Sequence, residues 1–308
     1  MHYVVTLVEE SYLIGAVTLY NSLIRNGFAG KYIIGYRNYN KLPIRSKQSI
    51  EGCDKSEIEL IEVDTKLHFT NYKPQFMKRI LAEYSDIEKI TYLDPDIVLA
   101  SPFEWIDKWC EGGPLASSDV NYWFPAEHPL RNHWMESLDL KCKHPLQYYI
   151  NGGQLSIKKE HSDFLNLWEN IMNKFQEITT DERLYAKGDI KNSRGSGRWD
   201  AFMAPDQDAL NIALMSWPNK ISILGPDVMG FTGMGMLPHA IGSHKPWKVC
   251  YVLRVFNGYG PRYVDKIFWK YANNPLQSYR KLFLIFKRLD LLLSGFLSRF
   301  YSKNKHLR

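Results

Sequence analysis

Short apolar runs and helical repeats alternate along the first hundred residues of the chain. Residues 3–8 form an almost continuous apolar run, which is typical of a strand buried on both faces. Leu13, Ala16, Leu19 and Leu23 then recur at helical spacing, and two more apolar runs follow at 32–36 and 58–63. The alternation of strand, helix and strand predicts an α/β fold with ligands at the carboxyl ends of the strands.

The same reading continues through the middle of the chain. It predicts helices at 74–84 and 161–176 and from Pro205, and strands at 90–93 and 115–120. Residues 121–149 are rich in aromatic, His and Pro residues and predict a long irregular segment, and 192–198 predict a loop. Such segments often form binding walls, although the histidines fit an ordinary surface equally well.

A last periodic segment closes the chain. Apolar residues recur every three or four positions, which predicts an amphipathic helix, at Leu282, Phe286, Leu289, Leu293, Phe296 and Phe300. Charged residues interrupt this stripe too often for a helix that spans a bilayer. We therefore predict two parts, a catalytic domain at residues 1–250 and a helical, basic extension at 251–308.

The positive charge is concentrated in that extension. The chain has 308 residues, 45% of them hydrophobic, and a formal net charge of +6. Residues 279–308 hold eight Lys or Arg against one Asp, which leaves the first 278 residues with a charge of −1. This distribution excludes a body-wide nucleic-acid surface and favours contact of residues 279–308 with an anionic membrane. The alternative is a terminal helix packed on the catalytic domain.

Cysteine usage and the N-terminus bear on location. The four cysteines are far apart and match no zinc spacing, and the first residues lack the pattern of a signal peptide. We expect a cytoplasmic protein that is peripheral on the inner face of the cell membrane.

The strongest candidate chemistry follows the strand at 90–93. Asp94 and Asp96 flank Pro95, which ends the strand because proline cannot donate to a sheet ladder. Two acids one residue apart on a bend can converge on one hard cation, which then faces a phosphate-bearing ligand. The alternative is a solvated turn, in which Asp and Pro are ordinary residues.

Three later motifs favour the cation site over the turn. Gly152 and Gly153 follow Asn151 and allow close approach to a ligand. Asp206 and Gln207 open a helix, where an acid alone is a common cap. Residues 239–247 then place an imidazole, a glycine, a lysine and a Pro-Trp pair within nine positions, which suits Mn²⁺ and phosphate oxygens.

With these motifs in order, the chain resembles family 8 of the glycosyltransferases. These are retaining enzymes of the GT-A (Rossmann-like) fold, including lipopolysaccharide galactosyl- and glucosyltransferases and glycogenin. The Asp-x-Asp motif of the family looks like Asp94-Pro95-Asp96, and the closing motif His-x-x-Gly-x-x-Lys-Pro-Trp is matched in full at residues 239–247. One departure is Glu9-Glu10-Ser11-Tyr12, where the family often has Asp-Asp-Asn-Tyr.

The resemblance implies a set of site residues. It implies Mn²⁺ or Mg²⁺ held by Asp94, Asp96 and His239, with His244 as a competing ligand. It implies catalytic roles for Asp206, Gln207 and Lys245. Donor binding is implied for Thr6, Glu9, Tyr12, Lys78 (with Arg79 as its alternative), Asp94, Asn151, Gly152, Gly153, Gly242 and Lys245.

The resemblance also implies the reaction. We expect a hexose, galactose or glucose, to move from a UDP-sugar to a saccharide acceptor, which we predict to be lipid-linked in lipopolysaccharide biosynthesis. Gln207 is a poor nucleophile, so front-face attack is favoured, while Asp206 and Asp208 remain alternatives for covalent catalysis. A self-glycosylating protein, a sugar nucleotidyltransferase and a non-enzymatic membrane scaffold stay open.

Overall fold

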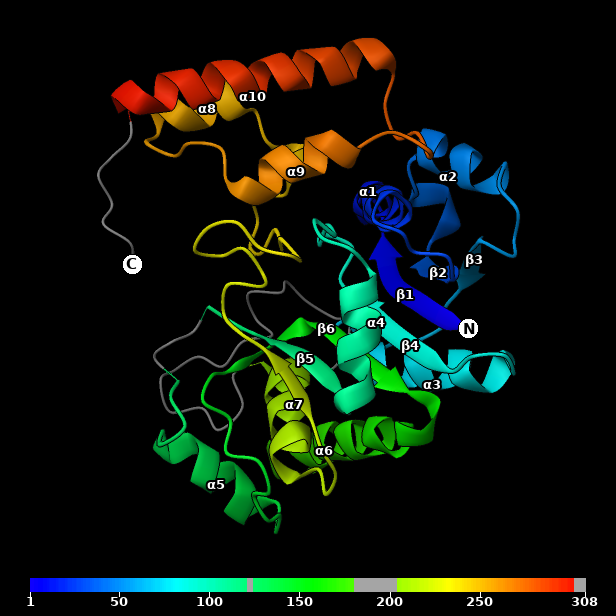
Figure 1. Ribbon diagram of the computed structural model, residues 1–308, viewed down its shortest axis with the longest axis vertical. Helices are drawn as coiled ribbons and strands as arrows, with labels where there is room; N and C mark the ends of the chain where they lie inside the picture. Colours follow the sequence, from blue (N-terminus) through cyan, green and yellow to red (C-terminus); the bar gives the residue numbers. More distant parts are fainter. Residues whose placement is uncertain (121–123, 180–203, 302–308) are drawn as a thin grey trace. The chain divides into compact units, whose positions relative to one another are not determined.

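The computed structural model describes residues 1–120, 124–179 and 204–301 (Figure 1). The loop predicted at 192–198 lies outside these residues. The strands are β1 His2–Glu9, β2 Lys31–Arg37, β3 Ile58–Glu62, β4 Lys89–Leu93, β5 Leu115–Ser118, β6 Ile150–Lys158 and β7 Ser222–Leu224. The helices are α1 Tyr12–Arg25, α2 Ile44–Glu51, α3 Lys73–Glu83, α4 Glu104–Trp109, α5 Pro129–Ser137, α6 Asp163–Thr179, α7 Pro205–Ser216, α8 Tyr251–Phe256, α9 Tyr263–Tyr271 and α10 Lys281–Tyr301.

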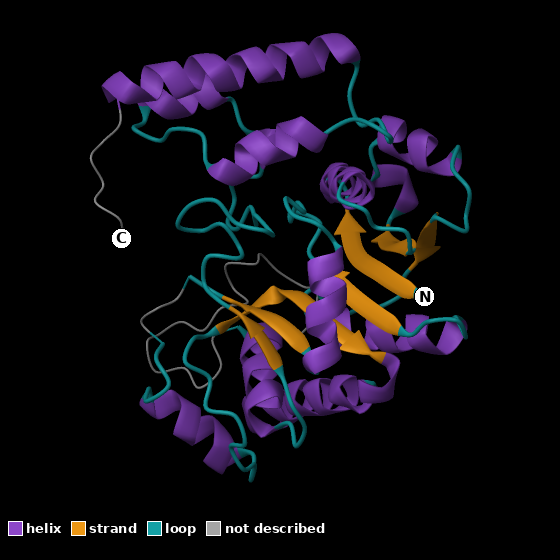
Figure 2. Ribbon diagram, viewed as in Figure 1, coloured by secondary structure: helices purple, strands orange, loops and turns teal. Residues whose placement is uncertain are grey.

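The strands form one mixed sheet. Its order is β3-β2-β1-β4-β6-β5-β7. Strand β4 runs parallel to β1 and antiparallel to β6, and β5 runs antiparallel to β6 and parallel to β7 (Figure 2). The predicted α/β sheet is therefore confirmed, with β6 as an antiparallel strand that the sequence pattern does not reveal.

The chain divides into two compact units. The first unit contains residues 1–7, 62–93 and 105–226, and the second contains residues 8–61, 94–104 and 227–308. The predicted division at residue 250 stays a prediction.

Helices α6 and α7 build the core of the first unit against β6. Both helices have large apolar side chains that are fully buried, among them Trp168 and Leu210. The buried side-chain amide of Asn211 on α7 accepts a hydrogen bond from the Ile150 N–H at 2.8 Å and donates one to the Ile150 carbonyl at 3.0 Å. This pairing fixes the middle of α7 beside the start of β6, because a buried amide without partners is costly.

Residues 121–149 are less irregular than predicted. Pro129 begins helix α5, since proline suits the first helical position, and the His128 ring accepts a hydrogen bond from the Leu130 N–H at 3.2 Å. Arg131 and Trp134 bury one face of this helix. Residues 121–123 lie outside the described parts.

In the second unit, α10 packs on α8 and α9 (Figure 1). Leu284 joins a buried cluster with Val249, Tyr251, Phe268 and Trp269. The Asp290 carboxylate accepts hydrogen bonds from the first two N–H groups of α8, at 3.1 Å and 2.9 Å, and so caps that helix. Across the described ranges, no helix combines the length and apolar character needed to cross a bilayer.

Candidate active site

Asp96 and His239 are brought together by the backbone of the second unit. The Val98 N–H donates to the Pro238 carbonyl at 3.1 Å, and the Ala240 N–H donates to the Asp96 carbonyl at 3.0 Å. Ile97 and His239 form an antiparallel bridge between these two bonds. The loop after β4 therefore pairs with the segment around His239 as two short antiparallel strands would. This pairing holds Asp96 beside His239, although the two residues are 143 positions apart in the sequence.

The two acids and the imidazole form one tight group. The His239 Nε2 atom lies 3.1 Å from the Asp96 carboxylate and 3.7 Å from the Asp94 carboxylate. One ligand atom from each of the three residues lies within 4.8 Å of the others. Asp96 is only 5% exposed and His239 only 7%, so this is not the solvated turn that was the alternative interpretation of the motif.

Lys245 adds a buried cation to this group. Its ammonium group contacts the Asp96 carboxylate and donates to the Ala240 carbonyl at 2.7 Å. Burial alone would raise the pKa of Asp96, but the charges and hydrogen bonds of His239 and Lys245 outweigh it, and the pKa is lowered. Burial alone would lower the pKa of Lys245, and the attraction of Asp96 raises it instead. Asp96 therefore stays ionised, as a metal ligand must.

The donor set fits a divalent cation. Two carboxylates and one imidazole are ligands that Mn²⁺ accepts and that Mg²⁺ accepts less readily. His239 Nε2 faces the carboxylates, while its buried Nδ1 atom has no hydrogen-bond partner among the residues that the structure describes. His244 is exposed, and its ring lies 3.4 Å from the Ser243 hydroxyl, so the described group uses His239.

Gly15 on α1 lets the Asp94-Pro95-Asp96 turn lie close to the helix. A Cβ atom at this position would fall 2.2 Å from the Pro95 carbonyl oxygen and 2.9 Å from the Trp247 ring. Trp247 also packs edge-on against Tyr12 and donates to the Ser11 hydroxyl at 3.3 Å. Trp247 of the closing motif thus holds the start of α1 beside the Asp94-Pro95-Asp96 turn.

A second polar cluster lies in the first unit, around the start of α7. The Gln207 amide oxygen accepts from the Gly152 N–H at 2.8 Å, and its nitrogen donates to Asp119 at 3.0 Å. Asn151 donates to the same Asp119 oxygen at 2.7 Å and accepts from the Gly153 N–H at 2.8 Å. Asp119, which follows β5, was not predicted as a site residue, although an acid at a strand end is the signal that identified Asp94.

Lys73 completes the second cluster in place of the predicted lysine. Its ammonium group donates to the Gly152 carbonyl at 2.7 Å and lies 3.3 Å from the Asp206 carboxylate. Lys78, on the same helix, instead pairs with Glu169 of α6 at 2.5 Å. Arg79 pairs with Glu83 at 2.7 Å. Of the three cations, only Lys73 joins Asp206.

The remaining predicted residues lie apart from these contacts. Glu9 pairs with Arg37 at 3.0 Å, and the fully buried Thr6 hydroxyl has no hydrogen-bond partner within the described parts of the chain. Gly242 has a φ of +77°, and Arg262 holds the loop around it by donating to the His244 and Ile241 carbonyls at 2.5 Å and 3.4 Å. Asp208 accepts a hydrogen bond from the buried Tyr149 hydroxyl.

No protein-family model matches the chain, and no curated protein sequence matches it. Solved structures do match. The apo bifunctional glycosyltransferase WbbM aligns at a TM-score of 0.54 and 15% identity, over 94% of this chain and 51% of its own. The galactosyltransferase LgtC, in complex with donor and acceptor sugar analogs, aligns at 0.54 and 14%, over 94% and 100%. The glycosyltransferase GlyE of Streptococcus pneumoniae aligns at 0.50 and 15%, over 99% and 65%.

The chain has a glycosyltransferase fold. The predicted GT-A sheet with its flanking helices is confirmed, and so is the helical extension at the C-terminal end of the chain. At these identities the likeness concerns the fold, and the chain spans only about half of WbbM.

Proposed function

We propose that the protein is a metal-dependent, retaining glycosyltransferase of the family 8 type, which moves galactose or glucose from a UDP-sugar to a saccharide. The observation that carries this proposal is the buried group of Asp94, Asp96, His239 and Lys245 in a glycosyltransferase fold. Buried acids need a compensating charge, and three converging ligands beside a lysine suit a cation and a diphosphate.

The metal group would serve the leaving diphosphate. Asp94, Asp96 and His239 would hold Mn²⁺, which would supply positive charge where negative charge develops on that leaving group. The Lys245 ammonium adds a second positive contact, and the Asp96 carboxylate holds it in place. Preorganised charges of this kind contribute about 3 kcal/mol each to the stabilisation of a transition state.

The second cluster would serve the sugar. Lys73 holds the Asp206 carboxylate, which can accept hydrogen bonds from sugar hydroxyls. Gln207 bridges the Gly152 N–H and Asp119, so its side chain is fixed beside the glycine at which a sugar ring can approach the backbone. Donor roles for Thr6, Glu9, Tyr12, Asn151, Gly153 and Gly242 remain part of the proposal.

In the proposed reaction the acceptor hydroxyl attacks on the face from which UDP departs. The bond between the anomeric carbon and the phosphate oxygen breaks, and UDP leaves with the electron pair. The acceptor oxygen forms the new bond, and its proton passes to the leaving phosphate oxygen. Gln207 as an amide supports this path, because an amide is a poor nucleophile and both of its ends are already hydrogen-bonded.

The acceptor is proposed to be lipid-linked, with the enzyme peripheral on the cytoplasmic face of the membrane. The predicted stripe of α10 supports this, because its apolar side chains point away from α8 and α9. Ile285 and Leu292 extend this stripe. Its eight side chains are between 47% and 70% exposed, and they are Leu282, Ile285, Phe286, Leu289, Leu292, Leu293, Phe296 and Phe300. At 100° per residue they cover an arc of about 120° that contains no charge, as in helices that lie in a membrane interface.

The test is a thermal-shift panel of nucleotide sugars, with and without Mn²⁺, followed by measurement of nucleotide release. We expect UDP-galactose or UDP-glucose to raise the melting temperature only when Mn²⁺ is present, since stabilisation grows with ligand concentration over Kd. The same donor should release UDP slowly without acceptor. Equal stabilisation by every nucleotide sugar in the presence of EDTA would contradict the proposal.

A further inference from the structure

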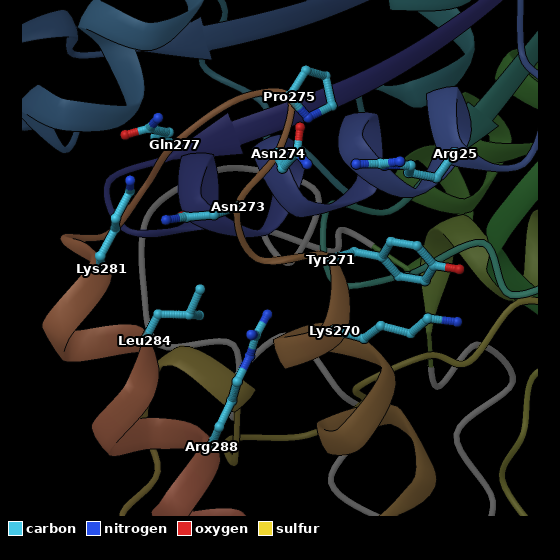
Figure 3. Close-up of a pocket in the computed structure, with 10 residues that line it drawn as sticks. All are labelled: Arg25, Lys270, Tyr271, Asn273, Asn274, Pro275, Gln277, Lys281, Leu284 and Arg288. Carbon is cyan, nitrogen blue, oxygen red and sulfur yellow. The ribbon is translucent and has the colours of Figure 1, made fainter.

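A basic cavity lies in the second unit, at the end of α1 and between α9 and the start of α10 (Figure 3). Its volume is about 680 Å³, within the range of sites for small molecules. Four cations line it, namely Arg25, Lys270, Lys281 and Arg288. Among its described lining residues there is no acid, so the cavity has one sign of charge.

The cations have no counter-charge in the described parts of the chain. None of the four forms an ion pair there; Arg288 donates to the Trp269 carbonyl at 3.4 Å, and Lys270 lies 5.0 Å from the Tyr271 ring. Figure 3 shows the Arg288 side chain extending from α10 towards the loop that joins α9 to α10. Four like charges around one hollow attract anions, and a phosphate group accepts several charge-assisted hydrogen bonds at once.

The wall between α9 and α10 is held in place by two side-chain amides. Asn21 of α1, which is fully buried, donates to the Tyr271 and Leu276 carbonyls at 2.9 Å and 3.0 Å and accepts from the Leu276 N–H at 2.8 Å. Asn273 accepts from the Ser278 and Tyr279 N–H groups at 3.1 Å and 3.2 Å. The loop is therefore preorganised, and a ligand bound beside it loses little free energy in ordering it.

The cavity adjoins the apolar face of α10. Lys281 and Arg288 are seven residues apart, two helical turns on one side of α10, and Leu284 lies between them. They flank the exposed apolar arc that includes Ile285 and Leu292. If the arc enters the acyl region of a membrane, the flanking cations come to the level of the phosphate headgroups.

We propose that this cavity binds the phosphate group of an anionic phospholipid, which fixes the orientation of α10 on the membrane. The ligand chemistry is a phosphate ester, and the adjoining apolar arc favours the lipid over soluble phosphate as its source. This inference rests on the membrane association in the proposed function and is independent of the glycosyl transfer.

The test compares two pairs of substitutions that remove equal charge from equivalent places. The cavity pair is Lys270→Gln with Lys281→Gln. The matched pair is Lys266→Gln with Arg280→Gln, two exposed cations at α9 and beside the start of α10 that do not line the cavity. Each protein is sedimented with phosphatidylcholine vesicles containing phosphatidylglycerol, and its thermal stabilisation by inorganic phosphate is measured in solution.

We expect the cavity pair to bind the anionic vesicles about tenfold more weakly than the matched pair. Equal loss in both pairs would overturn the inference, because binding would then be diffuse attraction. Loss of stabilisation by inorganic phosphate, with vesicle binding equal to that of the matched pair, would also overturn it. If the unsubstituted protein does not sediment, the membrane part of the proposed function fails as well. UDP release, assayed in parallel, should be equal in all proteins and tests the enzymatic part by itself.

Discussion

The Lys73 ammonium and the Asp206 carboxylate form a buried ion pair at 3.3 Å, and the same ammonium donates to the Gly152 carbonyl. The Lys73 side chain is 2% exposed, whereas that of Lys78, five residues later, is 37% exposed. Of these two lysines of α3, Lys73 is therefore the one that holds the acid of the second cluster.

Lys73→Met should lower the free energy of unfolding by about 3 kcal/mol, because it leaves the Asp206 charge without its buried partner. It should also weaken binding of the donor sugar. Lys78→Met should cost less than about 1 kcal/mol, since the pair with Glu169 is partly exposed. Urea unfolding of both variants measures this difference, and equal costs would contradict the assignment of Lys73.

Gln207→Ala tests the route of the reaction. The substitution removes the bridge between the Gly152 N–H and Asp119, so transfer should slow by about 10²-fold through lost positioning. Loss of a covalent nucleophile would cost about 10⁶-fold. Single-turnover transfer distinguishes the two, and the linkage of the product, read from an NMR coupling constant, should retain the α configuration of the donor.

His239→Ala should weaken Mn²⁺ binding by at least about 100-fold, because it removes one of three converging ligands. His244→Ala is the matched control, since it removes an exposed imidazole from the same loop. Titration of Mn²⁺ by calorimetry, without any donor, gives the affinity directly. A loss in the His244 variant and none in the His239 variant would reverse the assignment of the ligand.

Gly15→Ala should destabilise the protein by about 2 kcal/mol, since its Cβ atom would overlap the Pro95 carbonyl. The same overlap displaces the Asp94-Pro95-Asp96 turn, so Mn²⁺ affinity should fall with stability. Gly295→Ala, in α10, meets no atom within 4 Å and should stabilise the helix by about 0.5–1 kcal/mol. Thermal melts test both predictions: the melting temperature should fall for Gly15→Ala and rise for Gly295→Ala.

Periodicity was sufficient for much of the fold, because apolar runs predicted β1 to β5 and the sequence pattern predicted α1, α3, α6, α7 and α10. The grouping of Asp94, Asp96 and His239 was predicted from the Asp-x-Asp motif and from the family resemblance. Tertiary partners decided the rest. Lys78 meets Glu169 because α6 packs on α3, and a pattern along α3 does not contain that contact.

Isolated residues are also beyond the reach of a pattern. Asp119 is one acid after one strand, and its role emerges only when Asn151 and Gln207 meet it from β6 and α7. Gly15 lies in a helical repeat, and the sequence alone gives no reason for a glycine there. The reason is the Pro95 carbonyl, which leaves no room for a Cβ atom at this position. Helix α5 depends on Pro129 at its first position and on the cap from His128. The composition of residues 121–149 predicts an irregular segment and does not reveal this helix.

His2 provides a test of stability against pH that is separate from both clusters. Its ring lies 2.8 Å from the Thr91 hydroxyl and 2.9 Å from Asp107. Burial, only partly offset by Asp107, lowers the pKa of His2 from 6.5 to about 4. Between these values the unfolded chain holds a proton that the folded chain does not. The free energy of unfolding should therefore fall as pH drops from 6.5 towards 4, by about 2 kcal/mol at pH 5 relative to pH 7.

His2→Asn should remove most of that loss, because its amide does not titrate, whereas His133→Asn should retain it, since His133 is exposed. Urea unfolding at pH 7 and pH 5 for the three proteins isolates the contribution of one imidazole from that of the acids. If the His2 variant loses as much stability at pH 5 as the unsubstituted protein, the buried ring is not the group that takes up the proton on unfolding.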